Sequence, residues 1–437
     1  MVVLLTHSTA HAITQTGSIP RAQIVERIEA LSDSSQSYAL YLPSNYTPDR
    51  KWPVLYAFDP GARGRVPVER FKEAAEKYGW IVLGSNNSRN GPWNVVVNAW
   101  NAMLTDSHRR FAIDDERSYA TGFSGGARVA VHVAVGCKCL AGVMANGAGF
   151  PVDLAPSTGM HFVFFGAVGV DDFNYAELKI LDEPLTKAGI IHRVQTFEGR
   201  HEWPPVSVAT AAVEWMELHA IKAGKRPRDD GFMNAMWQQL LNEAGTLEEA
   251  KKYNEAYQLY FDLAQSFKGL RDVAEIETKL NQFSASREFK AAVREEQLQI
   301  KKQRELESRL DSLIAGHNGG SAVNQSEEAF DSGNLLRRIL NDLRKQSKAS
   351  EDSTQRRVAR RVLDGLFISL FEQGRSLLQT EKNYSESIKR FILATEVNPD
   401  RAGPFFYLAW AYAANRDKKK SLQSLNTAVE KGFPILP

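Results

Sequence analysis

Short hydrophobic runs alternate with amphipathic stretches over the first half of the chain. The short runs are typical of strands buried on both faces. They lie at 38–42, 53–58, 80–84, 117–121, 141–145, 162–166 and 193–197. The amphipathic stretches predict helices at 68–78, 94–111, 127–135, 175–188 and 206–223. This alternation predicts an α/β fold, a mainly parallel sheet with helices on both faces.

The composition changes near residue 223 and divides the chain. A charged, proline-containing stretch at 225–231 is typical of a linker, and the sequence after it is rich in Ala, Leu, Glu and Lys. We expect an N-terminal tail at 1–20, the α/β domain at 21–223, a linker at 224–231 and an all-helical domain at 232–437. The whole sequence has 437 residues, which exceeds what one compact core usually holds.

The helical half contains an internal repeat of 34 residues. The recurring positions are Ser387, Phe391 and Ala394, then Ser421, Leu425 and Ala428. A helix-turn-helix unit with this period resembles the tetratricopeptide repeat, most clearly at 366–432. A weaker unit is expected around Tyr253, Ala256 and Tyr260. An ordinary helical bundle is the alternative.

Charge and the N-terminus limit the partners and the location. The formal net charge of +2 gives no electrostatic case for nucleic acid or an anionic membrane. No apolar run approaches the roughly 18 residues that cross a bilayer. Residues 10–12, Ala-His-Ala, fit a signal-peptide cleavage site, although the positive leader region is missing. We expect a periplasmic or secreted protein with a truncated signal peptide; a cytoplasmic protein with a plain tail is the alternative.

Two cysteines, Cys137 and Cys139, are the only ones in the sequence. They are too few and too closely spaced for a disulfide framework or a zinc site. We expect them to be small buried side chains near a helix end. The sequence also carries no phosphate-binding loop and no metal-ligand motif, so no cofactor is expected.

The most specific motif is Gly122-Phe123-Ser124-Gly125-Gly126, which has the pattern G-x-S-x-G between a predicted strand and a predicted helix. A serine on such a sharp turn takes a strained, exposed position at the positive end of the following helix. The flanking glycines allow strand and helix to approach closely. The motif predicts Ser124 to be a catalytic nucleophile.

A serine nucleophile needs a base, and an acid to orient that base. Asp171 and Asp172 follow the strand at 162–166, and His201 follows the strand at 193–197. The carboxyl ends of parallel strands share one edge of the sheet, where the site of an open α/β sheet lies. The chain order Ser, Asp, His is that of the α/β-hydrolase triad.

Residues from about 36 to 220 resemble an esterase branch of the α/β-hydrolases related to polyhydroxybutyrate depolymerases, feruloyl esterases and dienelactone hydrolases. The resemblance is carried by 41–43 (Tyr-Leu-Pro), 86–93, 122–126 and 199–204 (Gly-Arg-His-Glu-Trp-Pro). It implies that Ser124 forms an acyl-enzyme with an ester and that His201 is the general base. We choose Asp172 over Asp171 as the acid, and expect the other aspartate to be a solvated helix cap.

The oxyanion hole needs two N–H donors, and Gly125, directly after the serine, should supply one. The other is expected from the loop after the strand at 53–58, where Asp59-Pro60 replaces the His-Gly of many relatives. Proline has no N–H, so the donor should be Gly61 or Ala62, and we choose Gly61. We expect Asp59 to be a hydrogen-bond acceptor that fixes this loop.

The loop at 85–93 also leaves the catalytic edge. Asn86, Arg89 and Trp93 are candidates for lining a substrate pocket. The alternative is a hydrogen-bonded turn with Trp93 as its hydrophobic anchor.

Together these patterns predict a serine hydrolase that cleaves a small-molecule carboxylic ester. The helical repeats are expected to bind a protein or peptide partner, or to restrict access of substrates. Two alternatives remain open: a non-catalytic binding protein with a hydrolase scaffold, and a serine peptidase on the same fold.

Overall fold

A computed structural model describes residues 19–318 and 328–434 of the chain. The chain forms two compact units. The α/β unit comprises Met1–Val170 and Glu177–Glu295, and the helical unit comprises Asp171–Ala176 and Glu296–Pro437. The tail and the signal-peptide site expected at 1–20 lie almost entirely outside the described residues.

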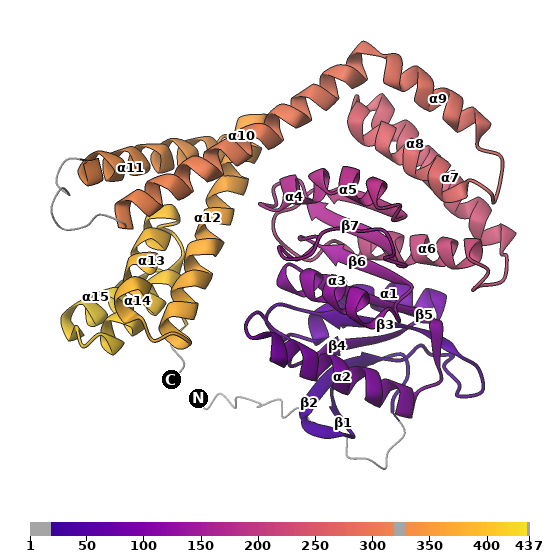
Figure 1. The fold of residues 1–437 in the computed structure, drawn as a ribbon, viewed down its shortest axis with the longest axis horizontal. Helices are drawn as coiled ribbons and strands as arrows, with labels where there is room; N and C mark the ends of the chain where they lie inside the picture. The colour runs from indigo at the N-terminus through magenta and orange to yellow at the C-terminus, as the bar shows by residue number, and fades with distance from the viewer. Residues whose placement is uncertain (1–18, 319–327, 435–437) are drawn as a thin grey trace, which may run out of the picture. The chain divides into compact units, whose positions relative to one another are not determined.

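An eight-stranded sheet forms the centre of the α/β unit, in the order β1-β2-β4-β3-β5-β6-β7-β8 (Figure 1). The two pairings that involve β2 are antiparallel and the other pairings are parallel, which confirms the predicted mainly parallel sheet. The strands are β1 (Ile24–Ala30), β2 (Asp33–Tyr41), β3 (Trp52–Phe58), β4 (Ile81–Ser85), β5 (Ile113–Phe123), β6 (Gly142–Asn146), β7 (Val163–Gly169) and β8 (His192–Phe197).

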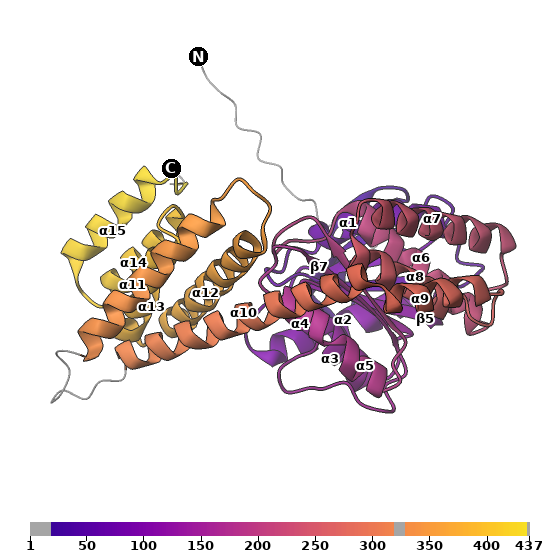
Figure 2. The same ribbon diagram turned by 90° about the horizontal axis from the view of Figure 1, so that it is seen from above.

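Helices cover both faces of this sheet. α1 and α6 pack together on one face, while α2 and α3 lie on the other (Figure 2). The helices are α1 (Arg65–Tyr78), α2 (Trp93–Arg110), α3 (Gly125–Cys137), α4 (Tyr175–Ile180), α5 (Asp182–Lys187) and α6 (Val206–Lys222). The prediction of one helix at 175–188 was wrong, because Pro184 interrupts it. A proline ring clashes with the carbonyl four residues earlier, and α4 ends at that residue, Ile180.

Three further helices share the core of the α/β unit: α7 (Asp230–Glu249), α8 (Tyr253–Phe267) and α9 (Ala274–Ala285). Trp237 and Leu263 belong to the same buried cluster as Trp215 of α6. Trp215 Nε1 donates a hydrogen bond to Ser266 Oγ at 3.0 Å. The compact unit therefore continues well past the composition change at residue 223.

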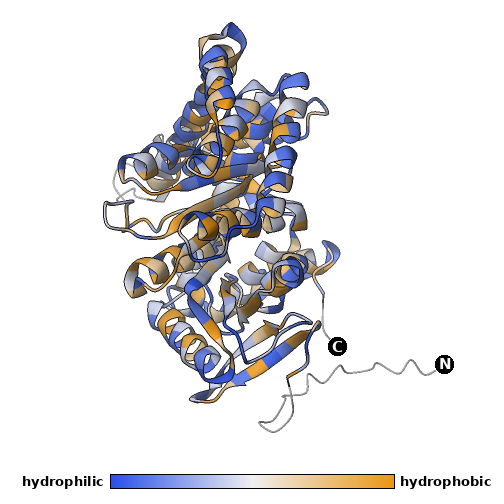
Figure 3. Ribbon diagram, turned by 90° about the vertical axis from the view of Figure 1, so that its right-hand side faces the viewer, coloured by the Kyte–Doolittle hydropathy of each residue, from blue (hydrophilic) through white to orange (hydrophobic). Residues whose placement is uncertain are grey.

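The helical unit contains the helices that follow. They are α10 (Arg287–Asn318), which enters it at Glu296, α11 (Glu328–Ser347), α12 (Thr354–Gln379), α13 (Tyr384–Val397), α14 (Ala402–Ala414) and α15 (Lys418–Glu430). Figure 3 shows hydrophilic and hydrophobic segments interleaved along the helical ribbons. This is the pattern of helices that bury one face.

The turn before α13 recurs 34 residues later, before α15. Lys382 and Arg416 have positive φ angles of 58° and 64°. The next residues, Asn383 and Asp417, each cap their helix by accepting a backbone N–H. The same turn type precedes α8, where Lys251 has a φ of 59°. The 34-residue period of the sequence thus corresponds to a repeated local structure.

The repeated serines also have matching roles. Ser387 Oγ donates to the carbonyl of Gly374, and Ser421 Oγ donates to the carbonyl of Ala409, each at 2.9 Å. Each bond ties a helix to the one before it. Phe391 and Ala394 are fully buried beside the first of these bonds, as core positions of a helical hairpin should be.

The prediction for the two cysteines was wrong. Cys137 and Cys139 form a disulfide at the end of α3. Cys137 is half-buried and Cys139 is exposed. A pairing between residues two apart in the sequence is missed when only long disulfide loops are considered.

Neither membrane-spanning helices nor metal clusters occur in the described parts of the chain. No helix there is both long and apolar enough to cross a bilayer. No group of three or more His, Cys, Asp or Glu side chains there could hold a metal ion.

Candidate functional site

Ser124 occupies a sharp turn between β5 and α3. Its backbone has φ 53° and ψ −120°, a conformation that residues with a Cβ rarely adopt. The Ser124 N–H donates to the carbonyl of Asn146, at the end of β6, over 2.8 Å. The Asn146 side chain in turn donates to the carbonyl of Gly122 at 2.9 Å. The neighbouring strand therefore holds the strained turn in place, and Asn146 is a supporting residue that the sequence motif did not identify.

The two outer glycines of the motif are sterically required. A Cβ on Gly122 would lie 2.0 Å from the carbonyl oxygen of Gly126, and a Cβ on Gly126 would lie 2.0 Å from that of Phe58. Both contacts involve backbone atoms that cannot rotate away. The close approach expected from the motif is thus present.

We expect Gly126→Ala to destabilise the turn strongly, by more than about 3 kcal/mol, because strand β3 must move to admit the methyl group. Gly136→Ala on the same helix is the matched control, since nothing lies within 4 Å of its added Cβ. The control should gain up to about 1 kcal/mol from helix propensity. Urea unfolding curves of both variants test this, and equal stability of the two would contradict the steric argument.

His201 lies within hydrogen-bond reach of the serine. Its Nε2 is 2.9 Å from Ser124 Oγ, the distance required between a nucleophile and its base. The imidazole packs against the ring of Phe123 at 4.6 Å between centroids. Both Ser124 and His201 are half-buried, so a reagent can reach them.

Asp59 fixes the loop after β3, as expected. Its buried carboxylate accepts hydrogen bonds from Arg63 at 2.8 and 2.9 Å, from the Gly61 N–H at 2.8 Å and from Trp203 Nε1 at 2.9 Å. Trp203 follows His201 by two residues. One carboxylate therefore ties the predicted oxyanion loop to the histidine loop.

These bonds bear on the predicted oxyanion donors. The N–H of Gly61 already has an acceptor, Asp59, and the N–H of Ala62 donates to the Asp59 carbonyl at 3.1 Å. A different polar group lies at Gly125. A Cβ built on Gly125 would be 1.9 Å from Asn90 Oδ1 and 3.3 Å from Asn90 Nδ2. The side-chain amide of Asn90, which the sequence reasoning missed, therefore faces the start of α3 beside Ser124.

The three candidate pocket residues have different surroundings. Asn86 Nδ2 donates to the Glu26 carbonyl at 3.0 Å, which fits the alternative of a hydrogen-bonded turn. Arg89 is exposed and its backbone pairs with that of Gly61. Trp93 is 45% exposed, so it is not a buried anchor, and its ring meets His132 edge-on at 4.4 Å.

The two candidate acids belong to the helical unit. Asp171 Oδ2 forms an ion pair with Arg360 at 2.7 Å and is nearly buried, so the expectation of a solvated cap was wrong. Asp172 is fully buried, and its Oδ1 accepts the N–H of Asn174 at 2.8 Å. The Asp172 carbonyl also accepts the N–H of Tyr175, the first residue of α4.

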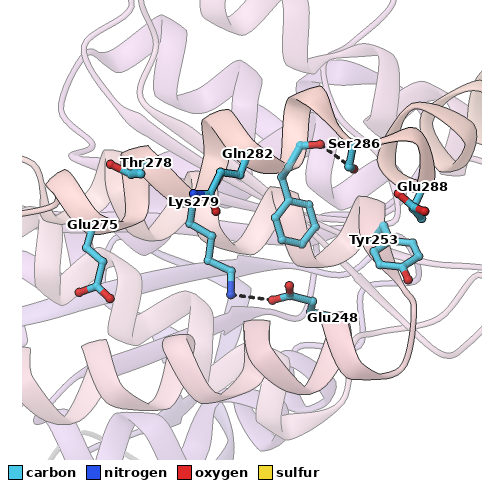
Figure 4. Close-up of a pocket in the computed structure, with 9 residues that line it drawn as sticks. Glu248, Tyr253, Glu275, Thr278, Lys279, Gln282, Ser286 and Glu288 are labelled. Carbon is cyan, nitrogen blue, oxygen red and sulfur yellow. Dashed lines mark hydrogen bonds and ion pairs between the residues drawn. The ribbon is translucent and has the colours of Figure 1, made fainter.

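A cavity of about 620 Å³ lies elsewhere in the α/β unit, among residues from α7 to α10 (Figure 4). Lys279 crosses it to an ion pair with Glu248 at 2.7 Å. Its other lining residues include Tyr253, Glu275 and Phe283. None of its residues comes from the Ser124, His201 or Asn90 loops, so it is separate from the serine site.

Known proteins were compared with the chain. No family model matches the sequence, and no curated protein matches it. Among solved structures, S-formylglutathione hydrolase FrmB from Staphylococcus aureus is similar at 14% identity, with 41% of this chain and 90% of that chain covered and a TM-score of 0.35. A ferulic acid esterase is 16% identical over 44% of this chain and 94% of that chain, with a TM-score of 0.37. An esterase from Pyrobaculum calidifontis is 11% identical over 46% of this chain and 87% of that chain, with a TM-score of 0.38.

These likenesses cover less than half of the chain, and their TM-scores are all below 0.5. The order of the strands and the serine turn between β5 and α3 stand independently of them. The α/β unit has an eight-stranded, mainly parallel sheet with helices on both faces. The case for an activity therefore rests on the geometry around Ser124.

Proposed function

We propose that the protein is a serine hydrolase that cleaves a carboxylic ester of a small molecule. The observation that carries this proposal is the 2.9 Å approach of His201 Nε2 to Ser124 Oγ. A serine held at a positive φ with a histidine at this distance has no evident structural benefit that would offset the strain. The alternative of a non-catalytic scaffold does not account for this pair.

In the proposed reaction, His201 takes the proton of Ser124 while the serine oxygen attacks the ester carbonyl. The protonated histidine then gives its proton to the departing alcohol, leaving an acyl-enzyme. Water, activated by His201 in the same way, releases the acid and restores the serine. The N-terminus of α3 places its positive dipole end at the developing oxyanion.

Asp172 is the acid that we propose to orient His201. Chain connectivity supports it: Asp172 follows Val170 by two residues, and the Val170 N–H donates to the carbonyl of Phe197, four residues before His201. The alternative, Asp171, has its carboxylate engaged by Arg360. A carboxylate already paired with a guanidinium is the poorer partner for an imidazolium.

For the oxyanion we propose two donors, the Gly125 N–H and the side-chain amide of Asn90. The N–H of Gly61, the donor expected from the sequence, would first have to break its hydrogen bond to the Asp59 carboxylate. An amide side chain can present its NH₂ to an oxyanion after rotation about its terminal bond, because its nitrogen and oxygen have nearly the same shape. Asn90 stands beside Gly125, where such a donor is needed.

We expect Asn90→Ala to lower kcat about 10²- to 10³-fold with little change in KM, as loss of one oxyanion donor does. Asn90→Asp should lower it further, because a carboxylate repels the oxyanion. Asn94→Ala, an exposed asparagine on the first turn of α2, is the control and should leave kcat unchanged. Steady-state hydrolysis of p-nitrophenyl acetate measures all three. Full activity of Asn90→Ala would mean that the second oxyanion donor comes from the loop at 59–64 instead.

We further propose that the helical repeats are tetratricopeptide-like and bind a protein or peptide partner. The repeated turn and cap at 382–383 and 416–417 support the repeat assignment. The Cys137–Cys139 disulfide supports an oxidising compartment, such as the periplasm or the exterior, over the cytoplasm.

A fluorophosphonate probe tests the proposed function directly, because it reacts only with activated serines. Wild-type protein should be labelled on the peptide that contains Ser124, as read by mass spectrometry, and Ser124→Ala should not be labelled. Matched p-nitrophenyl ester and anilide substrates then separate an esterase from the alternative of a peptidase. An unlabelled wild type would refute the proposal.

A further inference from the structure

A disulfide closes a very short loop at the end of α3. It joins Cys137, the last residue of the helix, to Cys139, two residues later in the sequence. Between them, Lys138 has a left-handed backbone, with φ 54° and ψ 22°, and the two cysteine Cα atoms lie 5.1 Å apart. A disulfide spans this separation without any movement of the backbone. The turn at Lys138 therefore brings the two sulfurs together by itself.

The chain around this disulfide is held by other contacts. The Lys138 N–H donates to the Ala134 carbonyl at 3.2 Å, and the Ala141 N–H donates to the Ser118 carbonyl at 2.8 Å. The Leu140 side chain is buried. A disulfide stabilises a fold less when the loop that it closes is shorter, and this loop is very short. We therefore expect the fold to persist when the disulfide is reduced.

The two sulfurs differ in their surroundings. Cys139 is exposed, whereas Cys137 is half-buried. The backbone N–H of Cys139 donates to Cys137 Sγ at 3.1 Å. This N–H and the positive charge of the neighbouring Lys138 stabilise negative charge on Cys137 Sγ, which offsets the unfavourable carboxyl end of the α3 dipole. Cys139 is therefore the sulfur that an incoming thiolate can reach, and Cys137 is the better leaving group.

A cavity of about 180 Å³ adjoins the disulfide. It is lined by Lys138 and Leu140, the two neighbours of Cys139, and by the loop at 157–162, which contributes Ser157 and Met160. None of the described residues that line it is acidic. The cavity therefore suits a small molecule with a short apolar stem and a negative charge.

We propose that Cys137 and Cys139 form a redox centre that exchanges with small anionic thiols, a function beyond the proposed ester hydrolysis. A thiolate attacks Cys139 Sγ and forms a bond to it, while the bond to Cys137 breaks and its electron pair leaves on Cys137 Sγ. A second thiolate attacks the sulfur of the first thiol in this mixed disulfide and releases a small symmetrical disulfide. Two small thiols are thereby oxidised, the protein disulfide is reduced, and the protons of those thiols end on the two cysteine sulfurs.

Mercaptopropionate, a small anionic thiol, tests the proposal on the full chain under native conditions. We expect it to reduce the protein disulfide about tenfold faster than it reduces hydroxyethyl disulfide, because Cys137 is the better leaving group. Maleimide labelling and mass spectrometry count the thiols released. The melting temperature, followed by circular dichroism, should fall by less than about 5 °C on reduction.

Two results would overturn the redox centre. The first is a disulfide that reacts no faster than hydroxyethyl disulfide, or only after the protein is unfolded in urea. The second is a larger fall in melting temperature on reduction, which would make the disulfide a structural cross-link.

The mixed disulfide shows which sulfur is attacked. The reaction is quenched with acid at early times and the free thiol is then alkylated with maleimide. Trypsin cleaves after Lys138 and so separates the two cysteines onto different peptides. We expect mercaptopropionate on Cys139 and maleimide on Cys137, and the opposite arrangement would refute the assigned roles.

Lys138→Glu tests the preference for an anionic thiol, with cysteamine as the cationic counterpart of mercaptopropionate. The ratio of the anionic to the cationic rate constant should fall about three- to tenfold, because an exposed charge acts on the thiol through water and salt. Lys268→Glu changes the net charge equally and should keep the wild-type ratio. Lys268 is mostly exposed and follows α8, which shares its core with α6, on the opposite face of the sheet from α3. An unchanged ratio in Lys138→Glu would refute selection by charge.

Discussion

Replacing Ser124 by alanine is expected to lower kcat for ester hydrolysis on the order of 10⁶-fold, and His201→Ala to lower it by a similar factor. The 2.9 Å hydrogen bond makes the two side chains one functional group: the serine is inert without its base, and the base has no proton to take without the serine. The double variant should therefore be no slower than either single variant. Steady-state kinetics with p-nitrophenyl acetate, at protein concentrations fixed by absorbance, measure all three.

A residual rate of ester hydrolysis is expected in these variants. The amides around Gly125 remain in every variant, so a rate above that of buffer should survive from oxyanion stabilisation and binding. His161→Gln, an exposed histidine ahead of β7, is the control for general effects of removing an imidazole. Multiplicative losses in the double variant would show that Ser124 and His201 act independently, which would refute the proposed mechanism.

The second large effect concerns stability in acid. His219 of α6 is buried beside the ring of Trp215, 4.2 Å away between centroids. Burial, and to a smaller extent the charge of Lys222, lowers the pKa of His219 to about 3. The unfolded chain binds a proton at this histidine below its ordinary pKa near 6.5 and the folded chain does not. The free energy of unfolding should therefore fall as the pH falls from 6.5, by roughly 4–5 kcal/mol near pH 3.

His219→Leu removes this titration while keeping an apolar side chain of similar size. We expect the variant to lose less stability than wild type between pH 7 and pH 4, because carboxylates titrate equally in both proteins. Thermal unfolding followed by circular dichroism across this range gives the difference. His161→Gln should keep the wild-type slope, and an equal slope in His219→Leu would mean that His219 is hydrated in the folded protein.

Part of the fold could be predicted because buried strands and amphipathic helices have different periods. The seven predicted strands all have counterparts in the sheet. β1 was missed because its sequence, Ile24–Ala30, interleaves apolar residues with Glu26, Arg27 and Glu29, as suits an edge strand. The split of α4 from α5 depended on one proline in an otherwise helical pattern.

The residues of the candidate site, too, could be predicted only in part. Ser124 and His201 follow from a local motif and from chain order, because the carboxyl ends of parallel strands meet at one edge. Asn90 and Asn146 carry no such signal: nothing in a loop asparagine tells which backbone atom its amide will meet. Gly61 was predicted as a donor because loops were considered singly, whereas Asp59 binds its N–H.

The sequence by itself determined the mainly parallel sheet, the serine turn and the 34-residue period, since each is encoded by neighbours along the chain. Only the tertiary structure decided which groups surround Ser124, that Asp171 is paired with Arg360, and that residues 171–176 belong with helices more than a hundred residues away. The physical reason is that periodicity and turn chemistry act over a few residues. A hydrogen bond or an ion pair between distant segments depends on the packing of the whole chain, which no local pattern specifies.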